Sequence, residues 1–328
     1  MIKTRLVNGR IKASLNTNVA AMAALSTLRT IDGAMGKTQS QVSSGYRIGQ
    51  AADNAAYWSI ATTMRSDHKA LSAVQDALSL GAAMVDVTYN GMSATLDVVD
   101  EIKKRLVAAR EPGVDKLKIN HEIDALKAQI YSIVESSSFS GQNWLYRIDA
   151  NDDADKQIVG SFTRSASGGV SVQTITYTMA TPLGTKHLLD DSYHNGILTN
   201  VEFARQLGTA TEWVLMNGKN HNIHPEIALT TATTMADIDE MISVVDYMIG
   251  YMADAASSLG ALSSRVSSQQ DFVSALRDAI SSGVGRLVDA DMNAASTRLK
   301  ALQTQQQLSL QALSIANSEP EKLLQLFQ

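Results

Sequence analysis

Two histidine-containing stretches have residue types that could hold a metal ion. His121 and Glu122 begin like the His-Glu-x-x-His helix of zinc hydrolases, in which both histidines bind the metal and the glutamate is the general base. The fifth position is Ala125, so the second ligand is missing. His221 and His224 also lie close together, but a proline follows His224 and no further ligand cluster is apparent. We therefore predict no metal site and a hydrogen-bonded loop around these histidines.

Other stretches could mark nucleotide or nucleic-acid binding. Gly283 and Gly285 lie within a helical pattern, whereas a dinucleotide-binding turn needs a preceding strand and a third glycine. The sequence contains no Walker-type phosphate loop and no Gly-x-Ser-x-Gly nucleophile turn. The basic run 103–105 lacks interleaved aromatic residues, which favours a solvated or partner-facing patch over a nucleic-acid site. The sequence thus predicts no catalytic residue, no cofactor and no enzymatic activity.

The composition is typical of long packed helices rather than of a compact enzyme. Of the 328 residues, 45% are hydrophobic but only 5% are aromatic, and there are four prolines and no cysteine. The absence of cysteine excludes disulfides and thiolate chemistry. A net charge of −5 provides no general basic field for nucleic acid. No uninterrupted apolar run of about 18 residues occurs, so we expect no membrane-spanning helix.

Apolar residues recur at helical spacings through the N-terminal part of the chain. A first tract, residues 15–42, carries few charges, and a second, residues 64–106, ends where Glu111-Pro112-Gly113 stops it. A third tract, residues 119–133, follows so closely that the second and third helices should pack antiparallel. The stripe of the first tract that needs a partner includes Leu15, Val19, Met22, Leu28, Ile31 and Met35.

The middle of the chain has a different pattern. Between residues 139 and 179, glycines and asparagines separate short alternating runs such as 170–177, which predicts one or two β-hairpins. Residues 181–227 are irregular, and within them the segment 201–216 fits a strand and a helix equally well. We therefore expect a small insertion here.

Helical patterns return in the C-terminal part. Residues 238–287 keep spacings of three and four for about 50 residues, a helix of roughly 75 Å. A last tract, residues 299–315, is expected to end near Pro320 and to be followed by a short apolar tail. The apolar positions of this C-terminal segment that need a partner are Leu299, Leu302, Leu310, Leu313, Leu324 and Phe327.

Together these patterns predict a mainly α fold. We expect a long antiparallel coiled-coil or helical-bundle rod in which the N- and C-terminal helices pair, with a β-hairpin region and a small central insertion. Each terminal stripe needs a partner, and the simplest partner is the other terminus.

Both ends of the chain carry the motifs of a known family. LNTNVAAMAALSTLR (15–29) and QVSSGYRIGQAADNAAYWSIATTMR (41–65) resemble the N-terminal signature of bacterial flagellins. LGALSSRVSSQQ (259–270), VDADMNAASTRLKALQTQQQLSLQALSIAN (288–317) and EKLLQLF (321–327) resemble the C-terminal signature. The N-terminal half is similar to flagellins of alphaproteobacteria in particular. The features that carry this similarity are the adjacent tyrosine and tryptophan after DNAA and the Met-rich tracts.

The resemblance implies a domain organisation. The terminal segments would pair as the family's D0 coiled coil, and the long helices with the hairpin would form its D1 rod. The leader carries four basic residues before the resemblance begins. The assignments are a basic leader (1–14), a D0-like part (15–47 and 289–328), a D1-like part (48–180 and 228–288) and a small variable outer insertion (181–227).

The resemblance also implies a function. The chain would be a secreted, extracellular structural subunit of the bacterial flagellar filament, polymerising with copies of itself for motility after type III export. Implied partners are other flagellins, hook-associated and cap proteins, and an export chaperone at the C-terminal segment 289–328; no nucleic acid and no membrane are expected. Two alternatives stay open: a hook–filament junction protein, or a flagellin whose insertion 181–227 binds a ligand.

The segment between the first two helical tracts matches the family's D0–D1 junction, where subunits touch. Gly45 lets the backbone turn, and Asp53 with Asn54 can cap the next helix. We also expect a polar contact between Arg47 and Asp53. The junction residues implied by the resemblance are Ser44, Gly45, Arg47, Ile48, Ala51, Asp53, Ala55 and Ala56.

Overall fold

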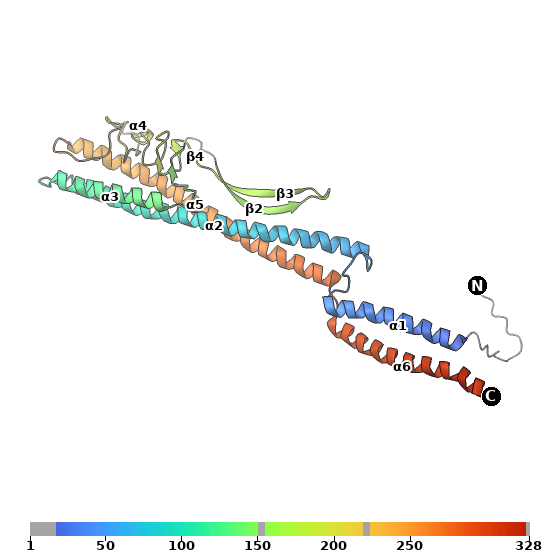
Figure 1. Ribbon diagram of the computed structural model, residues 1–328. Coiled ribbons are helices and arrows are strands. Elements are labelled where there is room, and N and C mark those ends of the chain that lie inside the picture. The colour runs from blue at the N-terminus through green and yellow to red at the C-terminus, as the bar shows by residue number, and fades with distance from the viewer. Residues whose placement is uncertain (1–17, 150–154, 219–223, 326–328) are drawn as a thin grey trace. The chain divides into compact units, whose positions relative to one another are not determined.

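The computed structural model describes residues 18–149, 155–218 and 224–325, and for residues 319–325 it describes the backbone (Figure 1). The chain forms two compact units. The first unit joins the residues up to His68 with those from Asp278 onwards, and the second runs from Lys69 to Arg277. The predicted leader, residues 1–14, lies outside the described residues.

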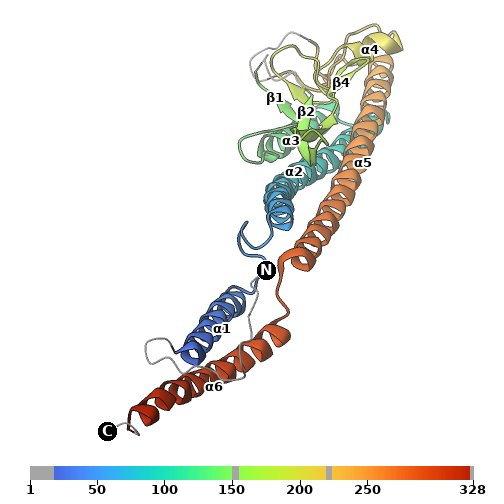
Figure 2. The same ribbon diagram turned by 90° about the vertical axis from the view of Figure 1, so that its right-hand side faces the viewer.

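The first unit is built on a pair of antiparallel helices, α1 (Val19–Ser44) and α6 (Met292–Gln325), which lie side by side in both ribbon views (Figure 2). On each helix a series of covered positions alternates spacings of three and four, as in the seam of a coiled coil. On α1 this series is Ala21, Ala24, Leu28, Ile31, Met35, Thr38 and Val42, and on α6 it is Ala295, Leu299, Leu302, Gln306, Ser309, Leu313 and Ala316. The predicted pairing of the two terminal helices is therefore confirmed.

The end predicted for α6 near Pro320 is wrong, because the helix continues to Gln325. A proline inside a helix has no N–H for the carbonyl four residues earlier, here that of Ala316. The side-chain amide of Asn18 donates to this carbonyl at 2.7 Å, and its Oδ1 also accepts from the N–H of Ala21 to cap α1. The partner helix thus satisfies the carbonyl that Pro320 leaves without a donor.

Two helices of 54 residues each, α2 (Ala55–Ala108) and α5 (Met235–Val288), run through both units. In the second unit α3 (Lys116–Ser136) follows α2 after the expected break at Glu111-Pro112-Gly113, and Asp115 caps it. Their apolar stripes form the core of this unit. Fully buried members include Leu78, Val85, Met92, Val99, Ile102 and Leu106 on α2, Ile123, Ile130 and Val134 on α3, and Met241, Val245, Met252, Leu259 and Val266 on α5.

Helix α2 also contains an 18-residue stretch with a mean hydropathy of 1.2, which is long and apolar enough to cross a membrane by length and composition alone. No other described helix passes this test. The core helix of a water-soluble protein passes it as well, and α2 contributes many of the buried residues of the second unit. The stretch is therefore weak evidence for a membrane span.

Short strands follow α3. The predicted hairpin is confirmed as β2 (Lys156–Arg164) paired antiparallel with β3 (Val170–Tyr177), and a second small hairpin joins β4 (Ala180–Thr181) to β5 (Gly184–Thr185). A parallel pair joins β1 (Tyr146–Arg147) to β6 (Leu189–Asp190). In the segment that fitted strand and helix equally, Glu202–Leu207 forms α4 and Val214 makes a single β-bridge.

The described residues of the insertion 181–227 pack on the helices of the second unit. Phe203 of α4 lies edge-on to Tyr247 and Tyr251 of α5, with ring centroids 5.8 and 5.0 Å away. The ammonium of Lys127 on α3, buried by the fold, pairs with the carboxylate of Glu226 at 3.1 Å. The insertion thus shares its core with α3 and α5.

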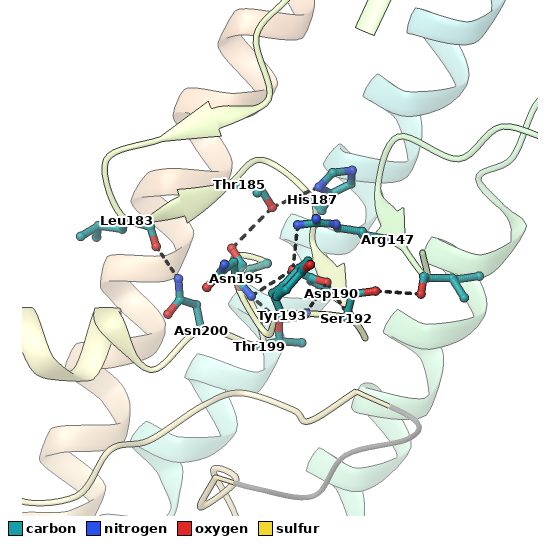
Figure 3. A network of polar contacts seen from close by, with 12 residues as sticks. Arg147, Leu183, Thr185, His187, Asp190, Ser192, Tyr193, Asn195, Thr199 and Asn200 are labelled. Atoms are coloured by element: carbon teal, nitrogen blue, oxygen red, sulfur yellow. Dashed lines mark hydrogen bonds and ion pairs between the residues drawn. The ribbon is translucent and has the colours of Figure 1, made fainter. Parts of the chain in front are cut away.

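The buried carboxylate of Asp190 accepts several hydrogen bonds within this insertion (Figure 3). Asp190 accepts from the N–H groups of Ser192, Tyr193 and Asn195 at 2.9–3.1 Å, and the Arg147 guanidinium lies 3.5 Å away. Both charged side chains are almost completely buried. Because buried charges are tolerated only when they are paired and hydrogen-bonded, these bonds fix the loop after β6 against β1.

Candidate functional site

The loop between α1 and α2, residues 45–54, is named the joint loop here, and it is tied to the end of α5. Gly45 ends α1 with φ 74°, a left-handed conformation that glycine adopts without strain. Its carbonyl accepts from the N–H of Ala290, and the N–H groups of Arg47 and Ile48 both donate to the carbonyl of Val288. The joint loop therefore has a defined position beside residues 288–290 within a single chain.

Asp53 closes the joint loop on itself. Its carboxylate accepts from the N–H groups of Gly49 and Gln50 at 3.1 and 3.2 Å and lies 3.6 Å from the ammonium of Lys37 on α1. The Gly49 N–H, together with that of Gln50 and the Lys37 charge, holds the pKa of Asp53 below its usual range. The cap of α2 is Asn54, whose side chain accepts from the N–H of Tyr57. The predicted capping role is thus that of Asn54, while Asp53 shapes the loop.

The expected contact between Arg47 and Asp53 is absent from the described single chain. The Arg47 guanidinium instead donates to the carbonyl of Leu287 at 2.7 Å. Beside it, the Arg65 guanidinium lies 4.6 Å from the ring centroid of Tyr46. Sequence reasoning missed this pair, as it missed Lys37, because residues this far apart in the chain carry no local signal of their contact.

The predicted junction residues differ in exposure. Ile48 is buried with Ala61, Val284 and Val288, and anchors the joint loop in a small core. Gly45 and Asp53 are half-buried. The remaining five, Ser44, Arg47, Ala51, Ala55 and Ala56, are exposed.

The predicted residues of the terminal helices also divide into two groups. Leu28, Ile31, Met35, Leu299, Leu302 and Leu313 lie in the seam between α1 and α6. Val19, Met22 and Leu310 are 75%, 62% and 51% exposed, so they face away from the seam. Leu15 and Phe327, and the side chain of Leu324, lie outside the described residues.

Two exposed apolar residues of α6 are not among the predicted interface positions, although one of them, Ile315, ends the predicted apolar tract. Leu308 is 57% exposed and Ile315 is 66% exposed. The sequence could have identified them, because they are apolar residues that fall outside the three-four spacing of the seam. This pattern is typical of a helix with a second apolar face. Helix α6 therefore presents apolar side chains to α1 and also to solvent.

The histidines do not form a metal site in the described residues. His121 is exposed on α3, and the rings of His224 and His194 lie edge-to-face with centroids 6.3 Å apart. No group of three or more metal-ligating side chains occurs among the residues that the structure describes. His221 is outside them.

Two family models match the ends of the chain. The bacterial flagellin N-terminal helical region matches residues 15–150, and the bacterial flagellin C-terminal helical region matches residues 242–327. The chain belongs to the bacterial flagellin family. As a family member it is an extracellular structural subunit of the flagellar filament and not an enzyme.

Similar flagellins span nearly the whole chain. Flagellin C of Rhizobium meliloti strain 1021 is 53% identical over 96% of this chain and 99% of its own length. Flagellin B of Rhizobium meliloti is 45% identical over 96% of this chain and its own full length. A Brucella melitensis flagellin is 39% identical, again over 96% of this chain. These relatives place the chain among alphaproteobacterial flagellins.

Proposed function

We propose that neighbouring copies in the filament pack against the solvent-facing apolar side of the α1/α6 pair and against the exposed part of the joint loop. One observation carries this proposal. Five apolar side chains of the helix pair are more than half exposed although the seam between the helices is already filled: Val19, Met22, Leu308, Leu310 and Ile315. Exposed apolar side chains in this number on two paired helices are typical of a surface that another chain covers.

Covering these side chains contributes favourable free energy to assembly. Fully burying an exposed Leu, Ile or Met side chain contributes about 1.5–3 kcal/mol. Five partly exposed side chains therefore contribute several kcal/mol for each subunit that joins. A filament also requires contacts between different surfaces of successive copies, which propagate instead of closing into a dimer.

The joint loop and the first turns of α2 offer a second surface. Ala51, Ala55 and Ala56 are exposed and small, so another backbone can approach them closely. They are followed by Tyr57, 43% exposed, and Ile60, 49% exposed. Since the joint loop is held by its own chain, it can present this surface to a neighbouring copy without reorganising.

The same exposed apolar residues of α6 are the surface on which we place the export chaperone, within residues 289–328. Before assembly Leu308 and Ile315 have no neighbouring subunit, and a chaperone would cover them. Other flagellins, hook-associated proteins and cap proteins are proposed partners of the same helix pair, since each has to join or end the filament.

The test is a matched pair of substitutions on α6. Ile315→Asp places a charge on the exposed apolar side, and Gln311→Asp places the same charge one turn earlier at an exposed polar position. We expect both purified monomers to keep the circular dichroism of the wild type. Only Ile315→Asp should lose filament formation, measured by sedimentation and negative-stain electron microscopy. Filaments from Ile315→Asp at wild-type yield would contradict the proposal.

A further inference from the structure

Met22 is the most exposed methionine in the described parts of the chain. Its side chain is 62% exposed on α1, against 42% for Met292 at the start of α6 and 41% for Met235 at the start of α5. The other described methionines are buried or half-buried. A thioether in water is open to oxidation, whereas a buried one is shielded from the oxidant, so Met22 is the first candidate for this chemistry.

Two hydrogen bonds fix the register of the antiparallel α1/α6 pair around Met22. The Asn18 amide donates to the carbonyl of Ala316, and the Gln306 amide donates to the carboxylate of Asp32, both at 2.7 Å. Met22 lies between these two bonds on α1, and the exposed apolar residues of α6 lie in the opposite stretch between them. Met22 is therefore level with those residues along the helix pair.

This end of the helix pair carries no charged side chain. Residues 18–28 of α1 and 301–318 of α6 include no Asp, Glu, Lys, Arg or His. On α1, Val19 and Met22 are followed at the same spacing of three by Leu25, which is 38% exposed. Residues three apart are neighbours on a helix surface, so a chain that covers Val19 and Leu25 also covers the thioether between them.

We infer that Met22 is an oxidation site that controls whether a subunit can join the filament, with hydrogen peroxide as the oxidant. The thioether sulfur attacks one peroxide oxygen, an S–O bond forms, the O–O bond breaks, and the peroxide is reduced to water. The resulting methionine sulfoxide is polar, and burying a polar group without a partner is unfavourable. The inference rests on the proposed function, which places Met22 under a neighbouring copy.

The experiment compares the assembly of full-length monomer before and after treatment with hydrogen peroxide. Peptide mass spectrometry measures the conversion of each methionine, and circular dichroism checks that the helices persist. We expect the treated wild type to leave a roughly tenfold higher monomer concentration after assembly. Methionine sulfoxide reductases A and B with dithiothreitol should restore assembly, because the sulfoxide oxygen leaves as water while dithiothreitol is oxidised to its disulfide.

Variants at the three exposed methionines assign the effect to one position. Met22→Leu keeps an apolar side chain without sulfur, so peroxide should change its residual monomer concentration less than about threefold. Met292→Leu and Met235→Leu remove the other two exposed thioethers and should remain as sensitive to peroxide as the wild type. Met22→Gln introduces a polar amide at the same position and should impair assembly without any oxidant.

Three results would each overturn the inference. They are normal assembly of treated wild type in which Met22 is fully converted, equal peroxide sensitivity of Met22→Leu and the wild type, and resistance conferred by Met235→Leu or Met292→Leu instead. Failure of the proposed function has a different signature. Met22 would then be oxidised as fast in assembled wild-type filaments as in the monomer, whereas a thioether covered by a neighbouring copy should react much more slowly.

Discussion

Asn18 should couple to Pro320 through the carbonyl of Ala316, although the two residues are 302 positions apart. The Asn18 amide donates to this carbonyl at 2.7 Å, and Pro320 has no backbone N–H with which to make the usual helical bond to it. Asn18→Ser keeps a good helix cap for α1 but is too short to reach Ala316. A net hydrogen bond contributes about 0.5–1.5 kcal/mol, so we expect this substitution to cost the helix pair about 1 kcal/mol.

In a chain that also carries Pro320→Ala, the cost of Asn18→Ser should largely disappear. Alanine at position 320 restores the N–H that donates to the Ala316 carbonyl, so the carbonyl no longer depends on Asn18. Asn18→Ser in this background should cost only a few tenths of a kcal/mol. Asn18→Ala, which also removes the cap, should cost about 1 kcal/mol in either background beyond the loss seen with serine.

Hydrogen exchange measured by mass spectrometry on peptides from α1 and α6 is the suitable assay, because it reports on the helix pair separately from the second unit. A loss of 1 kcal/mol corresponds to roughly fivefold faster exchange. The expected result is faster exchange for Asn18→Ser in the wild-type background and nearly unchanged exchange in Pro320→Ala. Equal acceleration in both backgrounds would refute the reasoning, since Asn18 would then stabilise the pair by another route.

Two further predictions concern the second unit and are both measured by urea denaturation of the monomer. Gly81→Ala on α2 should destabilise this unit by about 1–3 kcal/mol, because the new Cβ would overlap Ile158 of β2. Gly250→Ala, on α5 with open space around it, should instead stabilise the unit by about 0.5–1 kcal/mol. Equal effects of the two substitutions on stability would contradict the close packing of hairpin and helix. Burial raises the pKa of Glu226, but the Asn217 N–H and the Lys127 ammonium outweigh it and lower the pKa below its ordinary value of 4.5. A carboxylate whose pKa is lowered by folding contributes stability above pH 4.5, and this stability is lost as the pH falls through the folded-state pKa. The wild type should therefore lose more stability on acidification than Glu226→Gln. Parallel profiles of stability against pH for the two proteins would refute this prediction.

The helices could be predicted from the sequence because their signals are local. The three-four spacing of α5, the stop at Pro112 and the alternation of residues 170–177 each lie within a short window, and each element formed where it was expected. The end of α6 could not be predicted, because a proline normally ends a helix and the group that compensates for it, Asn18, lies at the opposite end of the chain. The same reason explains the joint loop: Asn54 follows a local capping rule, while the partners of Arg47 and Asp53 are set by tertiary structure.

The terminal stripes show most clearly what periodicity alone leaves undecided. A run of apolar residues at helical spacing indicates that a helix face is covered, but it does not say by which chain. Leu28 and Leu302 are covered within one chain, while Val19 and Ile315 are left in solvent by a fold whose seam is already complete. Because the seam follows a strict three-four alternation and the remaining apolar residues fall outside it, the two classes become separable once the partner helix is known. Substitution of the exposed apolar residues outside the seam should therefore impair assembly while leaving the monomer folded. Substitution of seam residues should impair both the folding of the monomer and its assembly.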